Sequence, residues 1–106
     1  MSYSIEQFKS LNRLNNIIIT QHGRKRLIER KIKAIDICSA INTGTIIEDY
    51  PNSFPFPCCL ILGYADRKPL HICASINEGY IYIITVYVPD TDKWDLNLKT
   101  RKDEAK

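Results

Sequence analysis

Residues 58–88 read CCLILGYADRKPLHICASINEGYIYIITVYV, and their pattern is the strongest indication of the fold class. It contains three apolar runs rich in β-branched and aromatic residues, which favour β-strands. Short polar segments separate the runs, and such short connections join antiparallel neighbours. The stretch therefore predicts a meander. Its strands are expected at residues 58–64, 70–77 and 80–88.

Upstream of this stretch, the apolar pattern predicts one more strand and two helices. Residues 45–50 keep the two-residue period of a strand, and a proline-rich loop at residues 51–57 leads to the meander. Before Gly44 the apolar period changes to 3.6 residues, which predicts a helix over residues 34–42. Another helix is expected over residues 21–31, after Thr20 as its N-cap.

The N-terminal residues 2–15 are expected to form a further helix, because Ser4 and Gln7 have the spacing of a capping box. The sequence thus predicts an α+β domain, with two or three short N-terminal helices packed on a four-stranded antiparallel sheet. Its 106 residues fit a single domain. We expect a core over residues 17–94 and a basic C-terminal tail over residues 95–106.

The basic residues are unevenly distributed. The chain has 15 basic and 12 acidic residues, a net charge of +3, but residues 21–33 alone carry six basic and one acidic residue. No long apolar run and no signal-peptide pattern is present, so we expect a cytoplasmic protein with no membrane segment. One short basic helix is therefore the first candidate for a binding surface.

Four cysteines are present, and two of them, Cys58 and Cys59, are adjacent. Without an export signal we expect reduced thiols that act as small buried apolar side chains. Their spacing lacks the Cys-x-x-Cys pairs typical of zinc sites. We expect no metal and no cofactor.

His22, Arg26 and Arg30 share one face of the basic helix, at spacing i, i+4 and i+8. A histidine with two guanidinium groups is able to bind a phosphodiester and stabilise charge that develops on it. Alternatively, this face is ordinary surface whose arginines pair with Glu48 or Asp49. Both interpretations stay open.

His71 lies in the middle of a predicted strand, where alternation places it opposite the core-facing residues. There we expect it to be half exposed and to titrate near neutral pH. In the last strand, alternation puts Tyr87 on the same face as Ile83. A purely structural role is the alternative for both His71 and Tyr87.

The tail holds the single tryptophan, Trp94, next to Lys93. Trp94 either stacks on a base of a bound nucleic acid or folds back to close the sheet edge.

The order of these motifs resembles the bacterial domain-of-unknown-function family 4258. The resemblance covers residues 17–102. Its motifs are ITQH at residues 19–22 with Arg26 and Arg30, Ile37, GTIIEDYP at 44–51, PCCLILG at 57–63, KPLHI at 68–72, ITVY at 84–87, Pro89-Asp90 through Trp94, and Arg101-Lys102. The chain departs from the family in having Gly23 where alanine is usual, which suggests a looser helix start.

This family is similar to ribonuclease-like toxins of the RelE, MqsR and BrnT kind, and its members are often encoded beside a small zinc-finger antitoxin. The resemblance therefore implies a toxin of a toxin–antitoxin pair, a metal-independent endoribonuclease acting on RNA. Its partners would be RNA and a cognate antitoxin, with the N-terminal helix either capping the sheet or mediating a homodimer. The expected catalytic residues are His22, Arg26, His71 and Tyr87. The expected RNA-binding residues are Lys25, Arg30, Lys93 and Trp94.

In this interpretation the two histidines act as acid and base in either order, and Tyr87 is a donor or an alternative acid. The rival hypothesis is a non-catalytic binding module, or a small regulatory protein, whose basic helix binds an acidic partner or nucleic acid.

Overall fold

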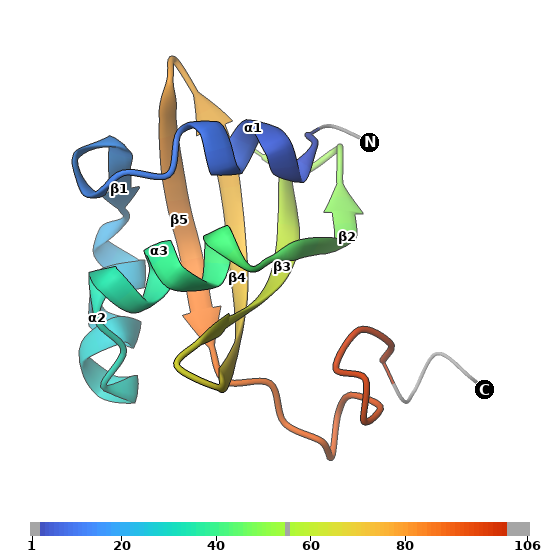
Figure 1. Ribbon diagram of the computed structural model, residues 1–106. Helices are drawn as coiled ribbons and strands as arrows, with labels where there is room; N and C mark the ends of the chain where they lie inside the picture. The colour runs from blue at the N-terminus through green and yellow to red at the C-terminus, as the bar shows by residue number, and fades with distance from the viewer. Residues whose placement is uncertain (1–2, 55, 102–106) are drawn as a thin grey trace.

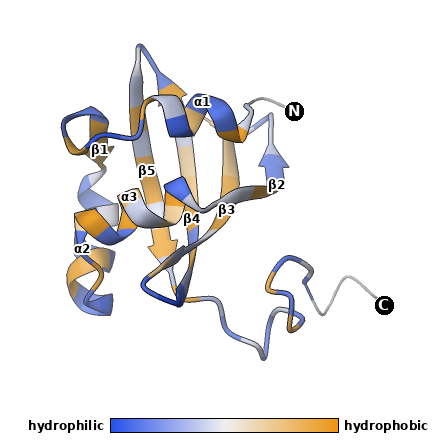
Figure 2. Ribbon diagram, viewed as in Figure 1, coloured by the Kyte–Doolittle hydropathy of each residue, from blue (hydrophilic) through white to orange (hydrophobic). Residues whose placement is uncertain are grey.

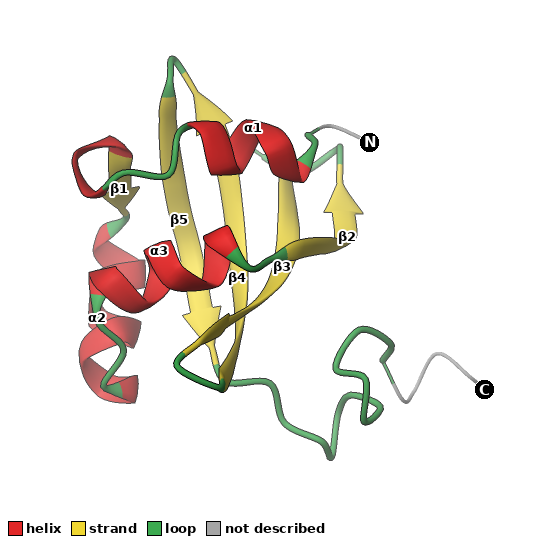
Figure 3. Cartoon of the chain, viewed as in Figure 1, coloured by secondary structure: helices red, strands yellow, loops and turns green. Residues whose placement is uncertain are grey.

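The computed structural model describes residues 3–54 and 56–101. Figure 1 shows the chain and Figure 3 its secondary structure. The elements are α1 (Ile5–Ser10), the 3-10 helix η1 (Leu14–Asn16), β1 (Ile17–Ile19), α2 (Gln21–Arg30), α3 (Ala34–Asn42), β2 (Thr45–Tyr50), β3 (Cys58–Ala65), β4 (Lys68–Asn77) and β5 (Tyr80–Tyr87). No helix among the described residues is long and apolar enough to span a membrane.

The α+β class is confirmed, and the prediction of a four-stranded antiparallel sheet is correct only in part. The sheet has five strands in the order β1-β5-β4-β3-β2. Strands β2 to β5 are antiparallel, as expected, whereas β1 pairs with β5 in parallel, with Ile17 beside Ile81. The three isoleucines of β1 indicate an extended segment, but nothing local identifies a partner more than 60 residues away.

The predicted N-terminal helix over residues 2–15 is shorter than expected. The capping box of Ser4 and Gln7 is present, but the helix ends at Ser10 and a separate 3-10 turn follows. Asn12, beyond the helix, donates a hydrogen bond to the Cys38 carbonyl at 2.8 Å. Short polar side chains that bond elsewhere compete with helical structure, which accounts for the early end.

Helices α1 and α3 lie over one face of the sheet, and α2 packs beside β5 (Figure 1). Figure 2 shows hydrophobic residues concentrated along β3, β4 and β5, whereas the segment after β5 is mainly hydrophilic. The fully buried side chains of Phe8, Ile37, Ile61 and Ile72 belong to the core between helices and sheet. No helix among the residues that the structure describes lies over the other face of the sheet (Figure 1).

Glycine permits two close contacts between helix and sheet. A Cβ added to Gly63 would lie 1.7 Å from the Ala40 carbonyl oxygen, so β3 has no room for a side chain beneath α3. A Cβ on Gly23 would lie 3.1 Å from the Ile83 carbonyl oxygen, and Thr20 caps α2 by accepting from the Gly23 amide. Gly23 thus has a packing role where the sequence suggested a looser start.

A β-bulge decides which side chains share the helix-free face. Cys73 pairs with Thr85 and Ala74 pairs with Ile83, which leaves Ile84 as an extra residue in β5. The bulge reverses the alternation, so Tyr87 lies beside His71 while Ile83 is buried in the core. The predicted grouping of Tyr87 with Ile83 is therefore wrong.

Candidate functional site

The segment after β5 covers the part of the helix-free face around His71. Trp94 is 3% exposed, and its ring meets the His71 ring edge-on, with centroids 4.4 Å apart. The Arg101 guanidinium carbon lies 4.7 Å from the centre of the Trp94 ring. Trp94 therefore folds back onto the sheet and is not presented to solvent.

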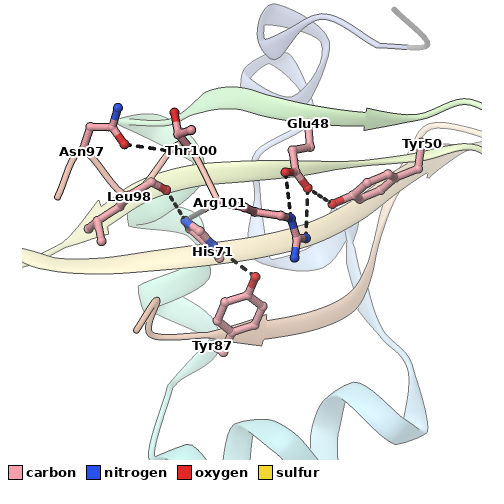
Figure 4. A network of polar contacts seen from close by, with 8 residues as sticks. All are labelled: Glu48, Tyr50, His71, Tyr87, Asn97, Leu98, Thr100 and Arg101. Atoms are coloured by element: carbon pink, nitrogen blue, oxygen red, sulfur yellow. Dashed lines mark hydrogen bonds and ion pairs between the residues drawn. The ribbon is translucent and has the colours of Figure 1, made fainter. Parts of the chain in front are cut away.

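A tight turn positions a backbone carbonyl above His71. The side-chain oxygen of Asn97 accepts hydrogen bonds from the amides of Lys99 and Thr100, and Leu98 has a left-handed φ of 61°. The Leu98 carbonyl oxygen then lies 2.7 Å from Nε2 of His71 (Figure 4). A non-glycine residue with this φ is uncommon, and it is retained here where it aims a polar group.

The two contacts of His71 define its tautomer. A carbonyl only accepts, so Nε2 carries the proton, and Nδ1 accepts from the Tyr87 hydroxyl at 3.1 Å. Burial lowers the pKa of His71, although the Leu98 carbonyl and the charge of Glu48 oppose this. His71 is fully buried, so the prediction of a half-exposed histidine is wrong. Its lowered pKa favours the neutral imidazole at pH 7. Alternation correctly placed it on the helix-free face but gave no sign of the covering segment.

Arg30 and Tyr87 meet at the edge of the covered region. Nη1 of Arg30 donates to the Val86 carbonyl at 2.6 Å, which brings the guanidinium carbon to 6.0 Å from the centre of the Tyr87 ring. Burial raises the pKa of the Tyr87 phenol. Tyr87 thus keeps its proton at neutral pH.

Glu48 holds the end of the covering segment on β2. Its carboxylate accepts two hydrogen bonds from Arg101, at 3.0 and 3.1 Å, and a third from the Tyr50 hydroxyl (Figure 4). Burial raises the pKa of Glu48, but these hydrogen bonds and the Arg101 charge outweigh it and lower the pKa overall. The Glu48 carboxylate therefore forms an ion pair with Arg101 of the segment after β5.

A cavity of about 640 Å³ opens between α2, the end of β5 and the covering segment. Three cationic side chains, one phenol and one carboxylate contribute to its wall, so its lining is positive on balance. The residues that line it are Arg30, Tyr87, Val88, Asp90, Lys93, Trp94 and Arg101.

The structure brings together only part of the predicted site. Arg30, Lys93, Trp94 and Tyr87 line the cavity, and His71 lies directly behind Tyr87. His22, Arg26 and Lys25 are not among the lining residues.

His22 lies eight residues before Arg30 on α2, a rise of about 12 Å. It is exposed, and its Nε2 accepts from Arg26 Nε at 3.4 Å. His22 and His71 therefore do not lie in one site.

Sequence reasoning did not assign Glu48 or Arg101 to the site. Their pairing spans 53 residues, and the tail conformation that produces it depends on Trp94 packing over His71. The available signal was a pair of acidic residues, Glu48 and Asp49, in a short strand that also holds two isoleucines. Among the described residues, no three His, Cys, Asp or Glu side chains gather as a metal site.

The fold and the cavity define an α+β domain whose helices cover one face of the sheet and whose polar cluster lies on the other. Residues 19–88 match the family model described as Domain of unknown function (DUF4258), and the chain belongs to this family. The chain matches no curated protein and no solved structure.

Proposed function

We propose that this protein is a metal-independent endoribonuclease that binds a phosphodiester of RNA in the cationic cavity. One observation carries the proposal: three cationic side chains line a cavity together with Tyr87, and the hydroxyl of Tyr87 is hydrogen-bonded to a buried histidine. The three are Arg30, Lys93 and Arg101.

The cationic groups suit the charge that a phosphodiester carries. Guanidinium groups donate several hydrogen bonds in a fixed plane and remain charged at any working pH. Cleavage places additional negative charge on the phosphate oxygens, and donors already in place stabilise it without reorganisation. Arg30 is held at the cavity wall by the Val86 carbonyl, which restricts its motion.

Tyr87 and His71 supply a proton relay. The 2′-oxygen attacks the neighbouring phosphorus as Tyr87 Oη accepts the 2′-hydroxyl proton and passes its own proton to Nδ1 of His71. The imidazolium that forms keeps the proton on Nε2, which donates a hydrogen bond to the Leu98 carbonyl. The negative charge of Glu48 stabilises this cation.

The relay then runs in reverse. The proton returns from Nδ1 to Tyr87, and Tyr87 donates to the 5′-oxygen as its bond to phosphorus breaks. The products are a 2′,3′-cyclic phosphate and a free 5′-hydroxyl, with no net change in protons. Groups that act in this way contribute roughly 10²- to 10⁴-fold to a rate.

The biological role that we propose is that of a toxin in a toxin–antitoxin pair in the cytoplasm. The support is the resemblance of the sequence motifs to a family similar to the RelE, MqsR and BrnT toxins, and this step is analogy. A cognate antitoxin, of the zinc-finger type, would neutralise the protein by covering the cationic cavity. Growth arrest on expression without the antitoxin tests this role.

The ribonuclease proposal is tested by incubating the purified protein with single-stranded RNA in excess chelator. We expect cleavage by the wild type, and an at least roughly hundredfold lower rate for Arg30→Ala because one phosphate donor is lost. Arg24→Ala is the matched control, an exposed arginine of the same helix that does not line the cavity. Equal rates for the two variants would contradict the proposed site.

Binding without cleavage is the second candidate function. The full burial of His71 favours it, since no histidine lines the cavity directly. In that case RNA or an acidic protein would bind with an affinity that falls steeply with salt, and no RNA would be cut.

A further inference from the structure

A second cavity, of about 440 Å³, lies on the same helix-free face. Aromatic rings and small hydroxyl-bearing side chains dominate its wall. Its lining residues are Thr20, Tyr50, Ser53, Phe54, Phe56, Cys58, Cys73, Ser75, Tyr82 and Ile84.

A series of hydrogen-bonded side chains joins the two cavities. Tyr50, in the wall of the second cavity, donates to Glu48, and Glu48 binds Arg101, which lines the first cavity (Figure 4). A ligand that extends across these side chains from one cavity to the other would place one part among aromatic rings and another among cations.

Two phenylalanines at the rim are exposed. Phe54 is 94% exposed and Phe56 is 43% exposed. Both belong to the short loop between β2 and β3. Aromatic rings next to a cationic groove are typical of single-strand nucleic acid sites, because every base has a flat face on which to stack. The hydroxyls of Ser53 and Ser75 add partners for the polar edge of a base.

We infer that the second cavity binds one unstacked nucleobase of a single-stranded RNA whose phosphodiester occupies the cationic cavity. The inference rests on the proposed function for the choice of RNA. A protein segment is a poorer occupant, because the aromatic wall adjoins a cationic cavity that fits a phosphate backbone.

The experiment measures binding separately from cleavage. The probe is a single-stranded 2′-O-methyl RNA, which has no free 2′-hydroxyl to attack phosphorus, with one 2-aminopurine whose fluorescence falls on stacking. We expect wild type to quench the probe. We expect Phe54→Leu/Phe56→Leu to abolish the quenching and weaken binding by about tenfold. Phe54→Tyr/Phe56→Tyr keeps both rings and is expected to restore quenching and affinity.

Tyr64→Leu is the matched control, since Tyr64 is also 43% exposed and lines neither cavity. The same probe with an abasic site in place of 2-aminopurine is expected to bind wild type and the Leu variant equally. The inference is overturned if the wild type does not quench the probe, or if the Leu variant binds and quenches as the wild type does. Loss of RNA cleavage is not part of this readout, so failure of the base site is distinguished from failure of the ribonuclease proposal.

Discussion

The proposed relay requires the hydroxyl of Tyr87. Tyr87→Phe keeps the ring beside His71 but removes the atom that accepts the 2′-hydroxyl proton. We expect kcat to fall about 10²-fold or more with KM nearly unchanged, because binding rests on the cations. Steady-state kinetics on a fluorescent RNA would measure this. Tyr64→Phe, outside the cavity, is the control, and a similar loss in both variants would contradict a specific role.

The proposed relay predicts a pH dependence that is set by His71. The relay needs a neutral Nδ1, so the rate falls as pH drops and His71 becomes protonated. Since burial lowers the pKa of His71 below 6.5, we expect a rate that is highest above neutral pH and that falls towards acid pH with a midpoint below 6.5. A pH–rate profile measures the midpoint, and a midpoint at or above 6.5 would show that a different group titrates.

At the scale of elements, the segment after β5 controls the environment of His71. Trp94→Ala removes the ring that covers the imidazole, so we expect the pKa of His71 to rise towards 6.5. An NMR titration of the His71 ring protons would measure the shift. Leu96→Ala, at a residue that is 89% exposed in the same segment, is expected to leave this pKa unchanged. If both variants give the wild-type value, the segment does not bury His71 in solution.

The packing of α3 on β3 depends on a missing side chain. Gly63→Ala places a Cβ 1.7 Å from the Ala40 carbonyl oxygen, so the helix must shift. We expect the free energy of unfolding to fall by about 1–3 kcal/mol or more, measured in urea. Gly79→Ala meets no atom within 4 Å and adds only the strain of a φ of 83°, so its loss should be smaller. A larger fall in the free energy of unfolding for Gly79→Ala than for Gly63→Ala would contradict the close contact between Gly63 and Ala40.

Local patterns in the sequence predict the strands β2 to β5 within two residues and the start of α2 at Gln21, after its N-cap Thr20. They fail where the structure depends on partners distant in sequence. The β5 bulge changes the face of Tyr87, and the pairing of β1 with β5 joins segments more than 60 residues apart. For the same reason the helical spacing predicted a site on α2, whereas Arg30 alone of that row reaches the cavity.

For the whole molecule, two groups with lowered pKa values make the fold sensitive to acid. His71 is neutral in the folded state but binds a proton near pH 6.5 when unfolded, so stability is lost as pH falls below 6.5. The pKa of Glu48 is also lowered, which adds a further loss below its ordinary value of 4.5. Urea midpoints at pH 7.5, 5.5 and 4 should decrease in that order.

A Glu48→Gln variant cannot titrate at this position, so its loss of stability between pH 5.5 and 4 should be smaller than that of the wild type. Unchanged midpoints in the wild type across this range would contradict the buried state of His71 and the pairing of Glu48.

The most direct test of the central claim uses an oligodeoxynucleotide that contains one ribonucleotide. Its single 2′-hydroxyl is the only nucleophile available for the proposed reaction. In excess chelator, we expect the wild type to cut at that position and leave a 2′,3′-cyclic phosphate detected by mass spectrometry, with an at least hundredfold lower rate for Tyr87→Phe. Cleavage of the all-deoxy strand, or equal rates for the wild type and Tyr87→Phe, would contradict a ribonuclease that works through Tyr87 and His71.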